Sequence, residues 1–172
     1  MNKSLIAPNK AKAVLAACNK QGLKLATAES CTGGLIAAAL TDIAGSASVV
    51  ECGFVTYSNA AKNTLIGVPA GFIEQYGAVS RQVAIAMAEG ALQHSRADIT
   101  VAVTGIAGPD GGTDEKPVGL VHMAVAAKGR DTRHYEARFG AKGRAEIRHA
   151  TVEQALGLVL DTLAAHYPDQ NY

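Results

Sequence analysis

Residues 25–34 read Leu-Ala-Thr-Ala-Glu-Ser-Cys-Thr-Gly-Gly and mark a strand that turns directly into a helix. The apolar, β-compatible run ends at Glu29, and a helical pattern begins at Leu35. Such a turn leaves the first N–H groups of the helix unpaired, and the helix dipole favours negative charge there. The stretch therefore predicts either a simple helix cap or a site for a phosphate or an oxyanion. Three nucleophile-type side chains and two glycines lie in the turn: Ser30, Cys31, Thr32, Gly33 and Gly34.

The composition is that of a globular α/β protein. At 172 residues we expect a single domain over residues 1–172, and 48% of the residues are apolar while only 5% are aromatic. The formal charge of +1 provides no basic field for nucleic acid or for an anionic membrane. Three cysteines without a Cys-x-x-Cys spacing argue against a disulfide framework or a zinc site and favour a cytoplasmic location. We expect no signal peptide, since residues 1–8 lack a long apolar stretch, and no apolar segment is long enough to cross a bilayer.

Hydrophobic periodicity and turn residues predict strands that alternate with helices. Helices are expected over 8–21, 34–43, 72–75, 80–94 and 144–166, with another that starts near residue 58 and carries Lys62. Strands are expected over 23–29, 49–57, 98–104, 118–127 and 132–139, of which the last two form a hairpin. The strand over 49–57 has apolar residues on both faces, so we expect it to be central and buried. This order predicts a three-layer α/β/α sandwich around a mixed, mostly parallel sheet.

Three of the predicted strand ends carry polar or glycine-rich segments, residues 29–34, 56–62 and 104–113. Ligands of open α/β sheets bind beyond the carboxyl ends of the strands. Neighbouring parallel strands would bring the three segments into one crevice. The sequence has no Gly-x-x-x-x-Gly-Lys-Ser/Thr loop and no Gly-x-Gly-x-x-Gly that opens a helix, and its five histidines are scattered without a ligand spacing. We therefore expect neither a P-loop, nor a dinucleotide site, nor a metal centre.

Lysine is the remaining candidate for a base beside Ser30. Ser–Lys pairs are a known variant of nucleophile and base, and a lysine can serve when its surroundings lower its pKa. Lys62 follows the second strand and is flanked by Ala60, Ala61 and Leu65, which suits a partly desolvated amine. The alternative is an ordinary exposed lysine on a helix, and the residue pattern alone favours that alternative.

Four motifs stand out along the chain. They are Ala-Glu-Ser-Cys-Thr-Gly-Gly (28–34), Thr-Tyr-Ser-Asn-x-x-Lys (56–62), Gly-Ala-Val-Ser (77–80), and Gly-Ile-Ala-Gly-Pro-Asp-Gly-Gly with Lys-Pro-Val-Gly (105–112 and 116–119). Over about residues 10–165 the chain resembles the CinA C-terminal domain family of competence/damage-inducible proteins. The resemblance implies a fold similar to anticodon-binding domains. It also implies hydrolysis of nicotinamide mononucleotide (NMN) to nicotinic acid mononucleotide and ammonia, without a metal or a cofactor.

The resemblance further implies roles for individual residues. Ser30 would be the nucleophile and Lys62 the general base, assisted by Tyr57, Thr32 and Thr104. The family usually has Gly-Asp-Arg ahead of the last helix, whereas residues 139–144 here read Phe-Gly-Ala-Lys-Gly-Arg, a stretch that is one residue longer. The phosphate contact is therefore expected at Arg144 or, one helical turn later, at Arg148. Further substrate contacts would come from Glu29, Gly33, Gly34, Gly105, Gly108, Gly111 and Gly112.

Two hypotheses of function follow. The first is an amidohydrolase that acts on NMN, in which one glycine loop holds the oxyanion and the other the 5′-phosphate. The second is a non-catalytic nucleotide-binding or partner-recruiting module that uses the same crevice. The expected partners are NMN and further copies of the same chain, with no nucleic acid and no membrane. Release of ammonia separates the two hypotheses, because a sensor would return NMN unchanged.

Overall fold

A computed structural model describes residues 6–167, and its elements follow the predicted order. The helices are α1 (Pro8–Lys20), α2 (Leu35–Thr41), α3 (Asn59–Ile66), α4 (Ala70–Tyr76), α5 (Arg81–Gln93) and α6 (Arg144–His166), with a 3-10 turn η1 (Ser46–Ser48). The strands are β1 (Leu25–Glu29), β2 (Val50–Val55), β3 (Ile99–Gly105), β4 (Leu120–Ala127) and β5 (Arg133–Arg138).

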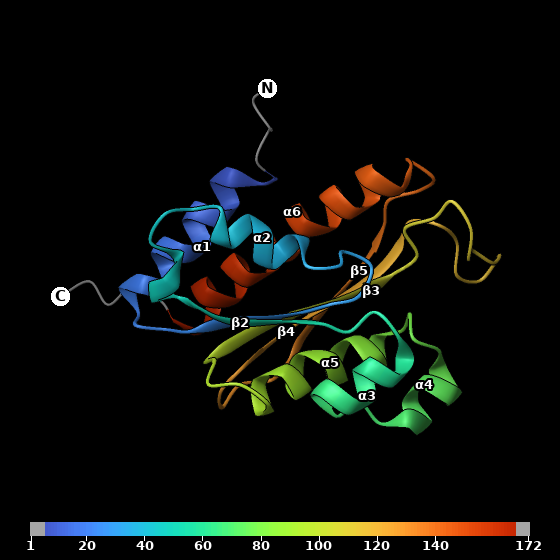
Figure 1. The fold of residues 1–172 in the computed structure, drawn as a ribbon, viewed down its shortest axis with the longest axis horizontal. Helices are drawn as coiled ribbons and strands as arrows, with labels where there is room; N and C mark the ends of the chain where they lie inside the picture. Colours follow the sequence, from blue (N-terminus) through green and yellow to red (C-terminus); the bar gives the residue numbers. More distant parts are fainter. Residues whose placement is uncertain (1–5, 168–172) are drawn as a thin grey trace.

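The strands form one sheet in the order β2-β1-β3-β4-β5. β1 pairs in parallel with β2 and β3, whereas β4 pairs antiparallel with β3 and β5. Four strands therefore run in one direction and β4 runs against them. Helices α1, α2 and α6 cover one face of the sheet, and α3, α4 and α5 cover the other (Figure 1). The predicted three-layer sandwich with a mixed, mostly parallel sheet is confirmed.

The prediction that the second strand is central and buried is wrong, because β2 forms one edge of the sheet and none of its residues is fully buried. Its apolar residues do pack on both faces. Val50 packs against the cluster beneath α1, α2 and α6, and Phe54 packs against the cluster beneath α5. An apolar pattern on both faces of a strand indicates that helices cover both faces of the sheet. It does not indicate whether the strand has a hydrogen-bonded neighbour on each side. Near the carboxyl end of β2 the side chain of Val55 is 49% exposed.

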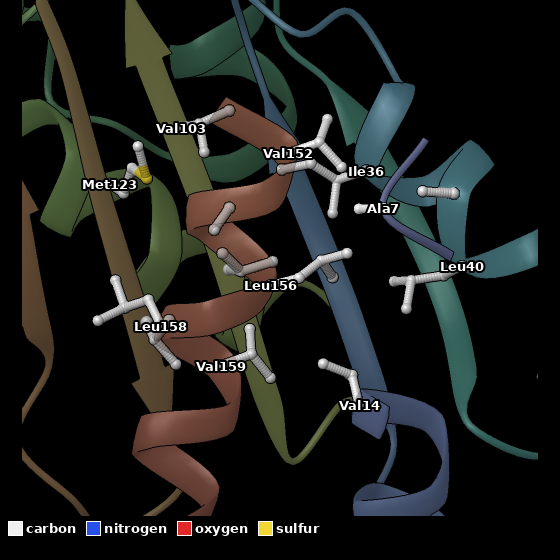
Figure 2. Packing of buried hydrophobic residues seen from close by; sticks show 14 of the residues in the cluster. Ala7, Val14, Ile36, Leu40, Val103, Met123, Val152, Leu156, Leu158 and Val159 are labelled. Carbon is white, nitrogen blue, oxygen red and sulfur yellow. The ribbon is translucent and has the colours of Figure 1, made fainter. Parts of the chain in front are cut away.

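The larger core cluster lies between the sheet and helices α1, α2 and α6. Figure 2 shows Val152, Leu156 and Val159 of α6 in the middle of this layer, with Val14 and Ile36 on their flank. All residues of β1 and β4 are buried. This packing fixes the strands rigidly, so the loops at their ends are held in place by the core. Within residues 6–167 no helix is both long and apolar enough to span a membrane.

The three polar segments lie together where the parallel strands of the sheet end. The carboxyl ends of β2, β1 and β3 are neighbours, as predicted, and β4 begins and β5 ends at the same edge. The loop from β3 to β4 and the start of α6 therefore lie there as well (Figure 1). The Phe139 N–H donates to the Gly119 carbonyl at 2.9 Å, which ties the segment before α6 to the end of that loop.

Candidate active site

Ser30 and Lys62 are in contact at this edge. Ser30 directly follows β1, and Lys62 lies on α3, which follows β2. The Nζ of Lys62 is 3.0 Å from the Oγ of Ser30. Ser58 fixes the start of α3, because its hydroxyl oxygen accepts a hydrogen bond from the Ala61 N–H. Two neighbouring strand ends thus bring together side chains that are 32 positions apart in the chain.

Lys62 is 1% exposed, so the alternative of an ordinary surface lysine is wrong. Its Nζ also lies 2.9 Å from the Thr56 carbonyl oxygen and 3.4 Å from the Tyr57 carbonyl oxygen. Burial lowers the pKa of Lys62, and a charge on Cys31 would oppose this effect. A neutral amine has two N–H groups and one lone pair. The two carbonyls can therefore accept both N–H groups while the lone pair faces the Ser30 hydroxyl, which suits a general base.

The Glu29 carboxylate holds the turn between β1 and α2 from the inside. Glu29 is fully buried. Its Oε2 accepts hydrogen bonds from the Thr32 hydroxyl at 2.6 Å and from the N–H groups of Gly34 and Ile36 at 3.0 Å each. Its Oε1 accepts from the Ala37 N–H at 2.9 Å.

These contacts correct two expectations. The first N–H groups of α2 do not await a ligand, because a carboxylate of the protein itself satisfies them. Neither the Glu29 carboxylate nor the Thr32 hydroxyl is directed at a substrate, since each is bonded to the other in the interior. The sequence shows that an acidic residue precedes the turn, but it does not show where the carboxylate points.

Arg148 of α6 holds the same turn from the outside. Its Nε donates to the Cys31 carbonyl at 3.1 Å and its Nη2 donates to the Thr32 carbonyl at 2.9 Å. The Gly33 N–H donates to the Ser30 carbonyl at 3.0 Å. The main-chain N–H of Thr32 has no hydrogen-bond partner among residues 6–167. It follows Ser30 by two positions, but Thr32 is fully buried, so this N–H is not exposed to a ligand in this structure.

Arg144, the first residue of α6, bridges the loops that follow β2 and β3. Its Nη2 donates to the Tyr57 hydroxyl at 2.7 Å and its Nη1 donates to the Gly108 carbonyl at 2.9 Å. The Tyr57 phenol therefore contacts Arg144, whereas the carbonyl of the same residue lies near Lys62. Tyr57 is 58% exposed, whereas Gly108 is buried. A pocket of about 190 Å³ adjoins Arg144, and its other lining residues are Ala107, Pro109, Val118, Ala141 and Gly143.

The glycines of the loop after β3 have a packing role. A Cβ would come within 2.9 Å of atoms in Val118, Leu120 or Val121 at three of the expected substrate-binding positions: Gly105, Gly108 and Gly112. The fourth, Gly111, takes a left-handed φ of 89°. The loop must therefore lie tightly on the segment that leads into β4. This close packing accounts for the glycines without a bound phosphate.

Thr104 and Lys116 attach the same region to the start of α5. The Thr104 hydroxyl donates to the Ala78 carbonyl at 2.8 Å, and the Lys116 Nζ donates to the Tyr76 carbonyl at 2.6 Å. Ser80 caps α5 as predicted. Thr104 is thus bonded to main chain before α5, and the structure does not bring its hydroxyl into contact with Ser30 or Lys62. The motifs at 77–80 and 116–119 support the site from a distance.

Two histidines that look scattered in the sequence lie together on β4 and β5. The Nδ1 of His122 is 3.0 Å from the Nε2 of His134, and the rings stack with centroids 5.2 Å apart. Burial lowers the pKa of both imidazoles. Within the described part of the chain, no three His, Cys, Asp or Glu side chains are grouped so as to hold a metal ion. The pair therefore reads as a structural contact across the hairpin.

Comparison with known proteins adds a family to this geometry. A model of the CinA C-terminal domain matches residues 8–163. A CinA-like protein of Akkermansia muciniphila is 51% identical over 87% of this chain, which covers 36% of that protein. The chain thus spans about a third of the length of this longer relative. A nicotinamide-nucleotide amidohydrolase, PncC, of Enterobacter agglomerans is 58% identical over 66% of this chain and 69% of its own length.

Solved structures agree with the family match. The competence/damage-inducible protein CihA of Agrobacterium tumefaciens has 54% sequence identity and a TM-score of 0.89, over 91% of this chain and 94% of that one. The competence damage-inducible protein A of Klebsiella pneumoniae has 35% identity and a TM-score of 0.88, over 94% of this chain and 98% of that one. The match therefore covers the whole sandwich and the edge that carries Ser30 and Lys62. With nearly all of its described residues inside the family's domain, this chain belongs to the CinA C-terminal domain family.

Proposed function

We propose that this chain hydrolyses the carboxamide of NMN to give nicotinic acid mononucleotide and ammonia, by a Ser30–Lys62 mechanism. The observation that carries the proposal is the contact between the buried Lys62 amine and the partly buried Ser30 hydroxyl. Two carbonyl oxygens lie next to the same amine nitrogen and hold it in place. The amidohydrolase name of the Enterobacter agglomerans relative supports the same chemistry. NMN as the substrate of this chain is part of the proposal.

In the first half of the reaction, Lys62 takes the Ser30 proton as the Ser30 Oγ attacks the carboxamide carbon. The carbonyl oxygen becomes an oxyanion, and main-chain N–H groups of the turn that follows Ser30 would stabilise it. One such donor typically lowers the activation barrier by about 3–4 kcal/mol. Protonated Lys62 then passes its proton to the departing nitrogen, so that the C–N bond breaks and ammonia leaves. The product of this half is an acyl ester on Ser30.

In the second half, Lys62 has returned to the neutral form and takes a proton from water. The hydroxide attacks the ester carbon, the Ser30 oxygen leaves with the proton held by Lys62, and the carboxylic acid is released. One base serves both halves because its position relative to the Ser30 Oγ is fixed by the Thr56 and Tyr57 carbonyls.

The 5′-phosphate of NMN is assigned to Arg144. This guanidinium is exposed, its present partners are a neutral phenol and a carbonyl, and a pocket adjoins it. A phosphate makes stronger, charge-assisted and bidentate hydrogen bonds to arginine than either partner. Arg148 is the weaker candidate, because its guanidinium already holds the Cys31 and Thr32 carbonyls.

The decisive experiment is to incubate purified protein with NMN and to quantify ammonia and nicotinic acid mononucleotide. We expect both products in equal amounts and the loss of both in Ser30→Ala. Full activity is expected in Ser48→Ala, which changes an exposed serine at the end of the 3-10 turn before β2. Binding of NMN without release of ammonia would overturn the proposal and favour the non-catalytic module.

A further inference from the structure

We propose that Glu29 is a positioning residue, which sets the Ser30 hydroxyl against the Lys62 amine through two separate sets of hydrogen bonds. This inference rests on the proposed function, since it assigns a task within the same site. Glu29 is a fully buried carboxylate, and the mechanism above gives it no chemical step. It makes no ion pair within the described part of the chain. A buried charge that is not paired with a cation must be matched by donors that the fold supplies.

The side chain of Glu29 fixes the segment that follows Ser30. All four of its partners donate, one from the Thr32 hydroxyl and three from the main chain at the start of α2. The usual way to cap a helix is a side chain at the N-cap position. Here the N-cap is Gly34, which has no side chain to offer, and the cap comes from the last residue of the preceding strand. One carboxylate therefore clamps both ends of the turn that contains Ser30.

The main chain of Glu29 fixes the segment that carries the base. Its carbonyl accepts a hydrogen bond from the Thr56 N–H at 2.8 Å. The carbonyl of Thr56 in turn accepts one from the Lys62 Nζ at 2.9 Å. The Ser30 N–H donates to the Val103 carbonyl at 3.1 Å, which extends the pairing with β3 by one residue. Glu29 thus joins the Ser30 turn, the Thr56 segment and, through it, the Lys62 amine.

A merely structural cap predicts a different result from a positioning residue. Glutamine has nearly the shape of glutamate but only one acceptor oxygen, so in Glu29→Gln an NH₂ group must face at least one of the N–H groups at the start of α2. Two donors cannot bond to each other, and the turn has to shift to separate them. A shift of about 1 Å at a catalytic group can cost about a hundredfold in rate. A structural cap would lower stability and leave the reactivity of the folded enzyme unchanged.

The test uses a fluorophosphonate probe on the full chain, together with NMN turnover. The Ser30 Oγ forms a bond to phosphorus, fluoride leaves, and the Ser30 proton passes to Lys62, so the labelling rate reports the Ser30–Lys62 geometry without NMN. We expect Glu29→Gln to lower the labelling rate and kcat by about a hundredfold, with little change in KM. Glu29→Ala should be slower still, which makes the glutamine variant a partial rescue.

Asp98→Asn is the matched control. The Asp98 carboxylate also accepts a main-chain N–H, that of Lys24 at 2.8 Å, but it lies before β3 at the opposite edge of the sheet. We expect this variant to lose stability and to keep wild-type labelling. Folding of each variant is followed by circular dichroism and thermal unfolding. Folded Glu29→Gln that labels and turns over NMN at the wild-type rates would overturn the proposal.

A second pair of variants covers a Glu29→Gln chain that does not fold. Thr32→Val removes one of the four donors to Glu29, and we expect labelling to slow by about tenfold. Thr162→Val removes a buried threonine hydroxyl that bonds the Leu158 carbonyl near the far end of α6, and should leave labelling unchanged. Equal rates in the two would overturn the positioning role. If wild-type protein labels at Ser30 but leaves NMN intact, the proposed function fails while the labelling rates still decide the role of Glu29.

Discussion

Replacing Lys62 by arginine separates a lysine that acts as a base from one that only supplies positive charge. Arginine keeps the charge and can still donate to the Thr56 and Tyr57 carbonyls, which lie 2.9 and 3.4 Å from the lysine nitrogen. Its guanidinium is not deprotonated in proteins. A base role therefore predicts a nearly inactive enzyme, and a charge role predicts an active one.

The size of the expected loss follows from the contact with Ser30. At 3.0 Å the Lys62 nitrogen is within reach of the proton that it must remove, and a positioned general base contributes typically about 10²–10⁴-fold. Because Ser30 and Lys62 would act as one unit, removal of the base should cost nearly as much as removal of the nucleophile. We expect kcat/KM of Lys62→Arg to fall by at least about a thousandfold.

The pH dependence provides an independent measurement of the same role. The active form is the neutral amine, so kcat/KM of the wild type should rise with pH and level off above the pKa of Lys62. Burial lowers this pKa, so the plateau should begin below the free-lysine value of about 10.4. The opposing influence of Cys31 requires its thiolate, and burial raises the pKa of Cys31 to about 12. At neutral pH the Cys31 thiol is therefore uncharged and does not oppose the effect of burial on the pKa of Lys62.

The assay is steady-state release of ammonia and nicotinic acid mononucleotide from NMN over a range of pH. Lys128→Arg is the matched control, because Lys128 is an exposed lysine that pairs with Asp98 at the opposite edge of the sheet. It should retain the wild-type rate and pH profile. Lys62→Met tests the effect of filling the same space without a charge and should be as inactive as Lys62→Arg. Turnover of NMN by Lys62→Arg near the wild-type rate would refute the reasoning.

Three further predictions use the same assay. Cys31→Ala should keep most of the activity and Ser30→Ala almost none, because burial holds the Cys31 thiol in its neutral form; the reverse pattern would identify a cysteine amidase. Nicotinamide riboside, which lacks the phosphate, should have a kcat/KM about 10–100-fold below that of NMN, and Arg144→Ala should abolish this difference. A preference for NMN that survives in Arg144→Ala would place the phosphate elsewhere. Activity should survive dialysis against EDTA, and a loss that zinc or magnesium restores would contradict the Ser–Lys mechanism.

The sequence predicts the layers of this fold well, because strands and helices differ in the period of their apolar residues. It also predicts that the ends of β1, β2 and β3 meet, since parallel strands that are linked by helices point the same way. It does not predict which strand forms an edge. The apolar residues Val50 and Phe54 of β2 pack against helices on opposite faces of the sheet, and the lack of a second neighbouring strand among the described residues leaves no trace in the apolar pattern.

Some contacts of the candidate site could be predicted from the sequence, and others could not. Ser30 and Lys62 could be predicted to approach one another, because Ser30 directly follows β1 and the helix that carries Lys62 follows β2, the parallel neighbour of β1. The targets of Glu29 and Arg148 could not, since both bind main-chain atoms, which every residue has and no sequence pattern distinguishes. The contact of His122 with His134 depends on the register of the β4–β5 hairpin, in which His122 lies opposite Glu136. Register is set by the turn and by packing, and neither is readable from isolated histidines.

Arg144 and Arg148 lie one helical turn apart at the start of α6, and their different partners indicate different roles. Arg148 is half-buried and bonds two carbonyls of the Ser30 turn, so its release would free the turn that the site depends on. Arg144 is exposed and bonds the carbonyl of the buried Gly108 and the phenol of the exposed Tyr57, which water can satisfy when the arginine turns to another partner. Arg144 can therefore give up its exposed contact with Tyr57 for an anion, whereas Arg148 would have to give up contacts that hold the Ser30 turn. Because the bridge of Arg144 spans the segments on either side of Ser30, a phosphate bound there would arrive with its nucleotide already over the nucleophile.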